Sequence, residues 1–232
     1  MNEAPLHPPP DHEPKGTDVT LNIMVLDGDP AAADGAAREL TEAGHVVLRC
    51  HEPGTAAFPC RGIVDQSTCP LGSHAVDVAL AVASPAQSAP VAADGGRCVL
   101  MHHVPLVVAG ASALDPYRAF ATRVVDGTND LVGACEAAAA AELPEHAARA
   151  EAVIASSIGL IGGAAPTVTV VRRAGGLHVR VAGLEHRTTA ERQAAVVRIV
   201  GALRAFDRAA RTIDVELGDV ETVDLVLGEP ST

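Results

Sequence analysis

Five residues with metal-ligating or redox-active side chains cluster in one part of the chain. Cys50 and His51 are followed by Cys60, Cys69 and His74, with no other Cys among them. Thiolate and imidazole are common ligands of Zn²⁺ and iron, and four converging groups complete a tetrahedral site. The cluster therefore predicts a zinc, iron or iron–sulfur site, or a redox-active thiol pair of Cys60 and Cys69.

The spacing of these cysteines leaves a third interpretation open, in which the thiols are inert. Structural zinc sites usually present two Cys separated by a few residues, and this sequence contains no such pair. Cys residues are also often buried for packing alone. We expect that role for Cys135, which lies in an Ala-rich segment.

A second candidate site is the acidic turn after the first apolar run. Asp27 and Asp29 flank Gly28 and follow the run directly. Carboxylates at the end of a strand can hold Mg²⁺ for phosphoryl chemistry. Asp29 followed by Pro30 is also typical of a helix N-terminus. Asp caps the helix, and the first helical N–H has no acceptor within the helix, so Pro loses no hydrogen bond there. We expect the capping role, and keep Mg²⁺ as the weaker alternative.

The elements expected around these residues alternate between strand and helix. Val19–Leu26 and His45–Cys50 are typical of strands, and the segment from Pro30 to Gly44 between them is typical of a helix. Further strands are expected at Val76–Val82, Pro105–Ala109 and Arg123–Val125, before a helix at Leu131–Ala141. This order predicts a parallel α/β sheet. The Cys/His cluster then falls in an irregular insertion, residues 51–75, beside the edge where such sheets bind ligands.

The pattern changes after Leu143. A helix is expected at Glu145–Ile158 and a second at Thr188–Ala205, where Thr188 and Glu191 form a capping box. The inward-facing residues of the second helix are predicted to be Ala194, Val197, Ile199, Val200 and Leu203. Strands are expected at Thr167–Arg172, Leu177–Ala182 and Thr212–Leu217, the last with a further stretch at Val223–Leu227. The order helix–strand–strand–helix–strand predicts a small α+β domain.

The chain thus divides into three parts. Residues 1–18 are rich in Pro and charge and are expected to be a disordered tail. Residues 19–143 form the α/β domain, and residues 144–232 the α+β domain.

Composition excludes several classes of function. The formal net charge is −12 and only 2% of the residues are aromatic, which argues against a nucleic-acid partner. No apolar run reaches the roughly 18 residues of a membrane helix, and no leader opens the chain, so we expect a cytoplasmic protein without a transmembrane segment. The only lysine is Lys15, in the tail, which excludes lysine-dependent sites from the folded part.

Residues 23–50 (IMVLDGDPAAADGAARELTEAGHVVLRC), with the later VDVALAV and VPLVVAGAS segments, resemble a response-regulator receiver domain. The resemblance covers about residues 19–141 and implies a flavodoxin-like sheet. Receivers hold Mg²⁺ with an acidic pair, carry a phosphoacceptor Asp after the third strand and use a Ser/Thr and a Lys. Here Asp27 matches the first acid, Val82 or Ala83 stands at the acceptor position, and Ser112 matches the hydroxyl. With no lysine available, the resemblance implies a pseudo-receiver.

The second part resembles a BON domain, a small module associated with binding lipid or protein surfaces. The matching segments are GGLHVRVAGL (175–184), TTAERQAAVVRIVGALRAF and TIDVEL. The resemblance covers about residues 145–218 and implies no catalytic residues. A local group of arginines, expected to be a solvated face, comprises Arg172, Arg173, Arg180 and Arg187.

Three hypotheses follow. The first is a non-enzymatic cytoplasmic regulatory or adaptor protein that binds a protein partner, with peripheral surface contact through the BON-like domain. The second is a metal, iron–sulfur or thiol sensor using the Cys/His cluster. The third is a Mg²⁺-dependent phosphoryl-transfer domain. The sequence leaves homo-oligomerisation open.

Overall fold

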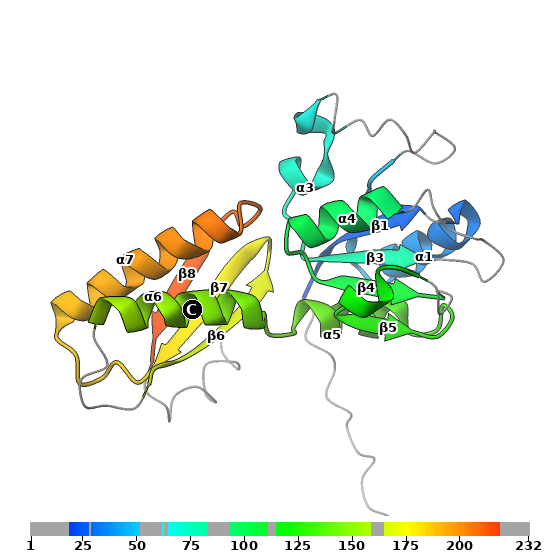
Figure 1. The fold of residues 1–232 in the computed structure, drawn as a ribbon. Helices are drawn as coiled ribbons and strands as arrows, with labels where there is room; N and C mark the ends of the chain where they lie inside the picture. The colour runs from blue at the N-terminus through cyan, green and yellow to red at the C-terminus, as the bar shows by residue number, and fades with distance from the viewer. Residues whose placement is uncertain are drawn as a thin grey trace, which may run out of the picture.

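The computed structural model describes residues 19–27, 29–51, 62, 65–82, 93–110, 115–158 and 165–218. They form two sheets with their own helices (Figure 1). The predicted tail 1–18 and most of the insertion 51–75 lie outside the described residues. Within the described part, no helix has the length and apolar character needed to cross a membrane.

The first sheet has five parallel strands in the order β2-β1-β3-β4-β5. The strands are β1 (Asn22–Asp27), β2 (Val46–Arg49), β3 (Val78–Val82), β4 (Leu106–Ala109) and β5 (Arg123–Val125). This is the flavodoxin-like order. The predicted α/β class is therefore confirmed, and each strand lies within a few residues of its predicted position.

Helices cover both faces of this sheet (Figure 1). One face packs on α1 (Pro30–Glu42) and α5 (Leu131–Ala139), and the other on α3 (Pro70–Ser73) and α4 (Ala93–Met101). Two 3₁₀ turns, Gln66–Thr68 and Arg118–Phe120, complete this part. Alternate β1 side chains enter opposite cores, which is why the strand is a continuous apolar run in the sequence.

No helix was predicted between the strands Val76–Val82 and Pro105–Ala109, where the structure has α4. Gly95 and Gly96 disfavour a helix by intrinsic propensity. In the structure Gly96 lies against the ring of Tyr117, and a Cβ there would be 2.8 Å from that ring. The close contact with Tyr117 explains why a glycine lies inside this helix, although glycine disfavours a helix locally.

The second sheet has three strands in the order β6-β7-β8. A hairpin joins β6 (Thr167–Arg173) to β7 (Gly176–Ala182), and β8 (Ile213–Leu217) pairs parallel to β7. The helices α6 (Pro144–Ile158) and α7 (Thr189–Phe206) lie side by side on one face (Figure 1). The capping box of Thr188 and Glu191 is confirmed.

The predicted inward face of α7 is only partly correct. Its buried residues are Ala195, Ile199 and Leu203, which recur every four positions. Val197 is 71% exposed and Ala194 is also exposed. Because α6 and α7 share one small sheet, α7 buries a narrower stripe than a helix that covers a sheet alone. The predicted stretch Val223–Leu227 lies outside the described residues.

Candidate functional site

The carboxyl ends of the parallel strands form the edge at which α/β sheets bind ligands. The strand register places Asp27 beside Val82, Val82 beside Ala109, and Ala109 beside Val125. Val82 is 1% exposed and belongs to the core between the sheet, α1 and α5. This row, which we call the carboxyl-edge row, thus contains one acidic residue followed by three apolar ones.

Asp29 caps α1, as its position before Pro30 predicts. Its Oδ1 accepts hydrogen bonds from the backbone N–H groups of Ala31, at 3.0 Å, and Ala32, at 3.3 Å. The carboxylate therefore satisfies amides that have no partner within the helix. Ala83, the alternative to Val82 at the acceptor position, and Ser112 lie outside the described residues. The side chain of Asp27 lies outside them too, so the Mg²⁺ site stays a prediction.

The Cys/His cluster is described only in part. Cys50 and Cys69 are half-buried and pack against the apolar core between the sheet, α3 and α4. His51 follows Cys50 after β2, and Nδ1 of His74 lies 2.8 Å from the hydroxyl of Ser73. Among the described residues, no group of three or more His, Cys, Asp or Glu side chains is placed to hold a metal ion. Cys60 lies outside them, so the metal and thiol-pair hypotheses stay predictions.

Cys135 has the packing role predicted for it. Its side chain is fully buried on α5 against the sheet. Burial, with smaller contributions from Glu136 and Glu39, raises the pKa of the thiol to about 12. The thiol is therefore protonated at neutral pH, and reactive cysteine chemistry requires the thiolate.

The second domain contains a buried charged cluster that was not predicted from its sequence. Arg172 is 1% exposed, Asp207 is fully buried, and His146 is buried beside them. One carboxylate oxygen of Asp207, Oδ2, accepts hydrogen bonds from Nε2 of His146, at 3.0 Å, and from the Arg172 guanidinium. We call these three residues the buried triad.

The second carboxylate oxygen of Asp207 is also satisfied. Its Oδ1 accepts from the backbone N–H groups of Ala209, at 3.0 Å, and Ala210, at 3.1 Å. Burial alone would raise the pKa of this carboxyl, but the hydrogen bond from His146 and the charge of Arg172 outweigh it and lower the pKa. Asp207 is therefore ionised at neutral pH. Removing any of its partners would leave part of this buried charge uncompensated.

The burial of Arg172 corrects its predicted place on a solvated arginine face. Val168, Val170 and Arg172 alternate along β6 and all face the helices, where Asp207 compensates the cation. Arg173, the next residue, is exposed as expected. The alternation of side chains along β6 is enough to predict that Arg172 faces the core. Its partner Asp207 could not be predicted, because the two residues are far apart in the sequence.

The buried triad also contacts the first domain. The Arg172 guanidinium donates to the backbone oxygen of His103, at 3.4 Å, in the turn between α4 and β4. The His103 ring centroid lies 4.2 Å from that of Phe206 and 5.4 Å from that of His146. Burial, and after it the electrostatic interaction with His146, lowers the pKa of His103. A hollow of about 550 Å³ opens beside this contact, between Phe120, Leu143 and Glu145.

A second polar joint holds the domains together at the start of β3. Asp77 is fully buried just before β3, and its Oδ1 accepts from the backbone N–H of Gly175 at 2.7 Å. Its Oδ2 accepts from the N–H of Asn22 at 2.8 Å. The Arg211 guanidinium donates to the backbone oxygen of Ser73 across the same contact. The two joints fix how the domains sit relative to each other.

Gly175 is required at the second joint for two reasons. Its φ of +69° lies in the left-handed region that residues with a Cβ adopt at a cost. A Cβ at this position would also lie 2.3 Å from the Cβ of Ala75 in the first domain. Gly175 therefore serves both the turn between β6 and β7 and the close contact with Ala75 of the first domain.

No protein-family model matches the chain, and no curated protein matches it either. The function is therefore argued from the geometry above.

The pKa of His103 predicts how stability depends on pH. Because the pKa is lower in the folded state, the unfolded chain binds this proton first as the pH falls through about 6.5. The free energy of unfolding should therefore decrease from about pH 7.5 to about pH 5.5. His103→Asn should flatten that decrease, since Asn tolerates the φ of +50° and does not titrate. Urea denaturation at both pH values, followed by circular dichroism, measures the difference, and an unchanged slope in the variant would contradict it.

Proposed function

We propose that this protein is a non-enzymatic regulatory or adaptor protein of the cytoplasm. In this proposal a receiver-like domain that has lost phosphoryl transfer is joined to a BON-like binding module. The observation that carries it is the carboxyl-edge row, in which Val82 is the neighbour of Asp27.

Phosphoryl transfer to a receiver needs a nucleophilic carboxylate at the end of the third strand and a cation at the end of the fifth. β3 ends at Val82, whose buried isopropyl group cannot accept a phosphoryl group. β5 ends at Val125 and is followed by Asp126, which has the opposite charge to the lysine of a receiver. These residues support a flavodoxin-like domain kept for binding.

The two polar joints support the adaptor part of the proposal. Asp77 and Gly175 are buried on both sides of one joint, and at the other joint the buried Arg172 donates to the half-buried His103. Separating the domains would leave these groups without their partners, which costs free energy for each one. A partner bound to one domain is therefore held in a defined orientation to the surfaces of the other.

A binding titration tests the proposal without relying on a covalent product. Mg²⁺ followed by beryllium fluoride, an analogue of the phosphoryl group, is added while the amide resonances of the ¹⁵N-labelled full chain are recorded. We expect no saturable shifts at Val82, Ala109 and Val125. An intact receiver with acidic pair, acceptor and lysine is the positive control. Saturable shifts at the carboxyl-edge row that require both reagents would contradict the proposal.

A further inference from the structure

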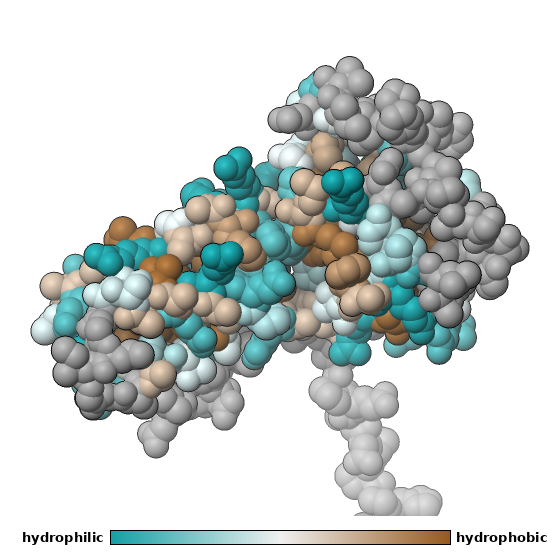
Figure 2. Space-filling model, in the orientation of Figure 1, coloured by the Kyte–Doolittle hydropathy of each residue, from teal (hydrophilic) through white to brown (hydrophobic). Residues whose placement is uncertain are grey.

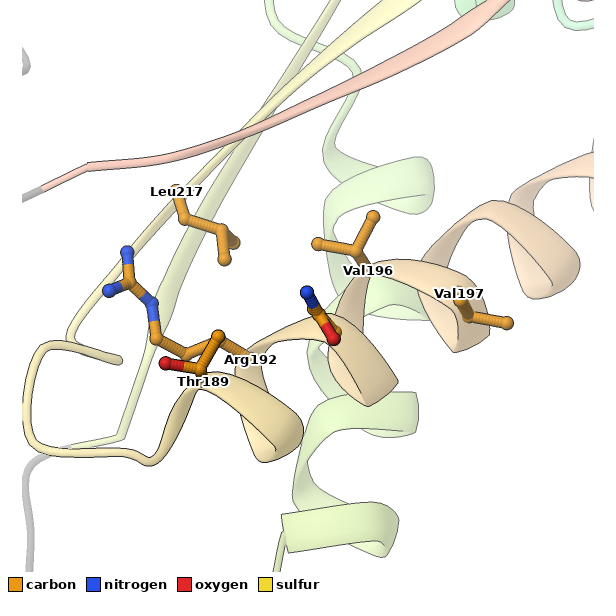
Figure 3. A pocket seen from close by; sticks show the side chains of 6 residues that line it. Thr189, Arg192, Val196, Val197 and Leu217 are labelled. Carbon is orange, nitrogen blue, oxygen red and sulfur yellow. The ribbon is translucent and has the colours of Figure 1, made fainter.

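A surface groove lies between α7 and β8 in the second domain. Its volume is about 470 Å³, and Figure 3 shows Leu217 of β8 and Val196 of α7 pointing into it. Val197, which also lines the groove, is 71% exposed. Figure 2 shows apolar patches on the surface over α7. An apolar helix face left in water at the side of a small sheet indicates a binding surface.

The strand beside this groove has an open edge. β8 is the last strand of its sheet, and the N–H of Gly218 points to Val181 on β7, at 3.0 Å. Because successive amides alternate in direction along a strand, those of Ile213, Val215 and Leu217 point away from β7. Among the described residues, no strand pairs with that edge. An unpaired edge is a template for another strand.

The chain that follows β8 has the sequence of such a strand. Val223, Leu225 and Leu227 alternate with Asp224 and Val226. β8 has the same alternation, in which the helix-facing apolar residues are separated by the exposed Asp214 and Glu216. The segment begins six residues after Leu217, which lines the groove.

We propose that residues 223–227 add to β8 as an antiparallel fourth strand and cover the groove. A five-residue connection, residues 218–222, is a common hairpin length and pairs Val215 with Leu225. In that register Val223, Leu225 and Leu227 share a face with the apolar residues of β8 and lie over the exposed side of α7. The groove is then the site of this chain's own segment.

Charge at the end of the groove agrees with this occupant. Arg192 lines the groove, and its Nε is buried without a hydrogen-bond partner among the described residues. The connection 218–222 contains Asp219 and Glu221, and it must pass this end of β8. A carboxylate there satisfies the donor, whereas a buried donor left unpaired costs free energy.

Charge on the other face of the sheet disfavours a second copy as the occupant. Antiparallel pairing of two β8 strands about Val215 would place Asp214 opposite Glu216 twice, and like charges directly opposite are destabilising. The intramolecular hairpin makes one such pair, Glu216 with Asp224. Nε of Arg180 lies 3.4 Å from the Glu216 carboxylate and offsets that repulsion.

Amide hydrogen exchange, measured by NMR on the full chain, tests the proposal. The amides of Ile213, Val215 and Leu217 should exchange slowly, and about tenfold or more faster in a chain shortened to residue 218. A nuclear Overhauser contact between Val215 and Leu225 in the full chain is expected independently. Core amides, such as that of Ile199, report whether the shortened chain is folded.

A matched pair of substitutions separates docking from a general effect of charge. Leu225→Lys should accelerate exchange at the β8 edge as the shortening does, because residue 225 faces the groove. Val226→Lys should leave exchange unchanged, because residue 226 faces the opposite side, where a cation lies opposite Asp214. Rapid exchange at this edge in the full chain, or equal effects of both substitutions, would overturn the proposal. Protection that persists in the shortened chain and rises with protein concentration would overturn it in favour of a second copy.

Discussion

Asp207→Ala is expected to lower the free energy of unfolding by about 3–5 kcal/mol, because it leaves a buried cation without its counterion. Arg172 is 1% exposed, and its charge is compensated inside the protein by this carboxylate. The substitution also removes the acceptor of His146 and of two backbone N–H groups. Since whole domains are stable by about 5–15 kcal/mol, much of the second domain's stability should be lost. Urea denaturation followed by far-ultraviolet circular dichroism measures the change.

Two controls separate charge pairing from loss of a side chain. Asp214→Ala removes an exposed carboxylate of β8 and should change stability by less than about 0.5 kcal/mol. The double variant Arg172→Met with Asp207→Leu removes both charges and should recover much of the loss, as apolar replacements of buried ion pairs often do. An Asp207→Ala variant as stable as Asp214→Ala would contradict the buried triad.

Asp77→Ala is expected to loosen the joint between the domains. It removes the acceptor for the backbone N–H groups of Gly175 and Asn22, one in each domain. Each buried donor left unpaired costs about 1–3 kcal/mol, so the free energy of unfolding should fall by about 2–6 kcal/mol. The radius of gyration from small-angle scattering should also increase, because part of the loss can be relieved by separating the domains.

The choice of variants distinguishes the joint from general destabilisation. Asp77→Asn keeps one carbonyl acceptor and should lose about half as much stability. Gly175→Ala should open the joint through its clash with Ala75, whereas Gly44→Ala, with φ +91° and open space around it, carries the backbone strain alone. If Gly175→Ala and Gly44→Ala gave the same radius of gyration, the proposed domain contact would be wrong.

The local elements could be predicted well from the sequence, for identifiable reasons. Strands such as β1 are continuous apolar runs because both faces of a parallel sheet are covered, and Asp29 with Pro30 marks the start of α1 by local hydrogen bonding. The burial of Arg172 and the helix α4 were not predicted, because both depend on contacts between residues far apart in the sequence. The partner of Arg172 is Asp207, and the glycines of α4 are explained by Tyr117.

For the candidate sites too, features set by the local sequence were predicted and features set by distant contacts were not. The capping role of Asp29 and the packing role of Cys135 follow from local pattern, and both are confirmed. The two joints could not be predicted, because the sequence around His103 and Asp77 does not indicate that either residue contacts the other domain. The groove beside β8 became visible only when the structure showed Val197 exposed rather than buried.

Intact-mass measurement after incubation with acetyl phosphate and Mg²⁺ tests the central claim most directly. We expect the chain to keep its mass, because β3 ends at Val82 beside Asp27 and no lysine follows β5. The same reagents must phosphorylate an intact receiver measured in parallel. A stable gain of one phosphoryl group, located on an aspartate at the carboxyl edge of the sheet, would contradict the account and identify the domain as a phosphorylated switch.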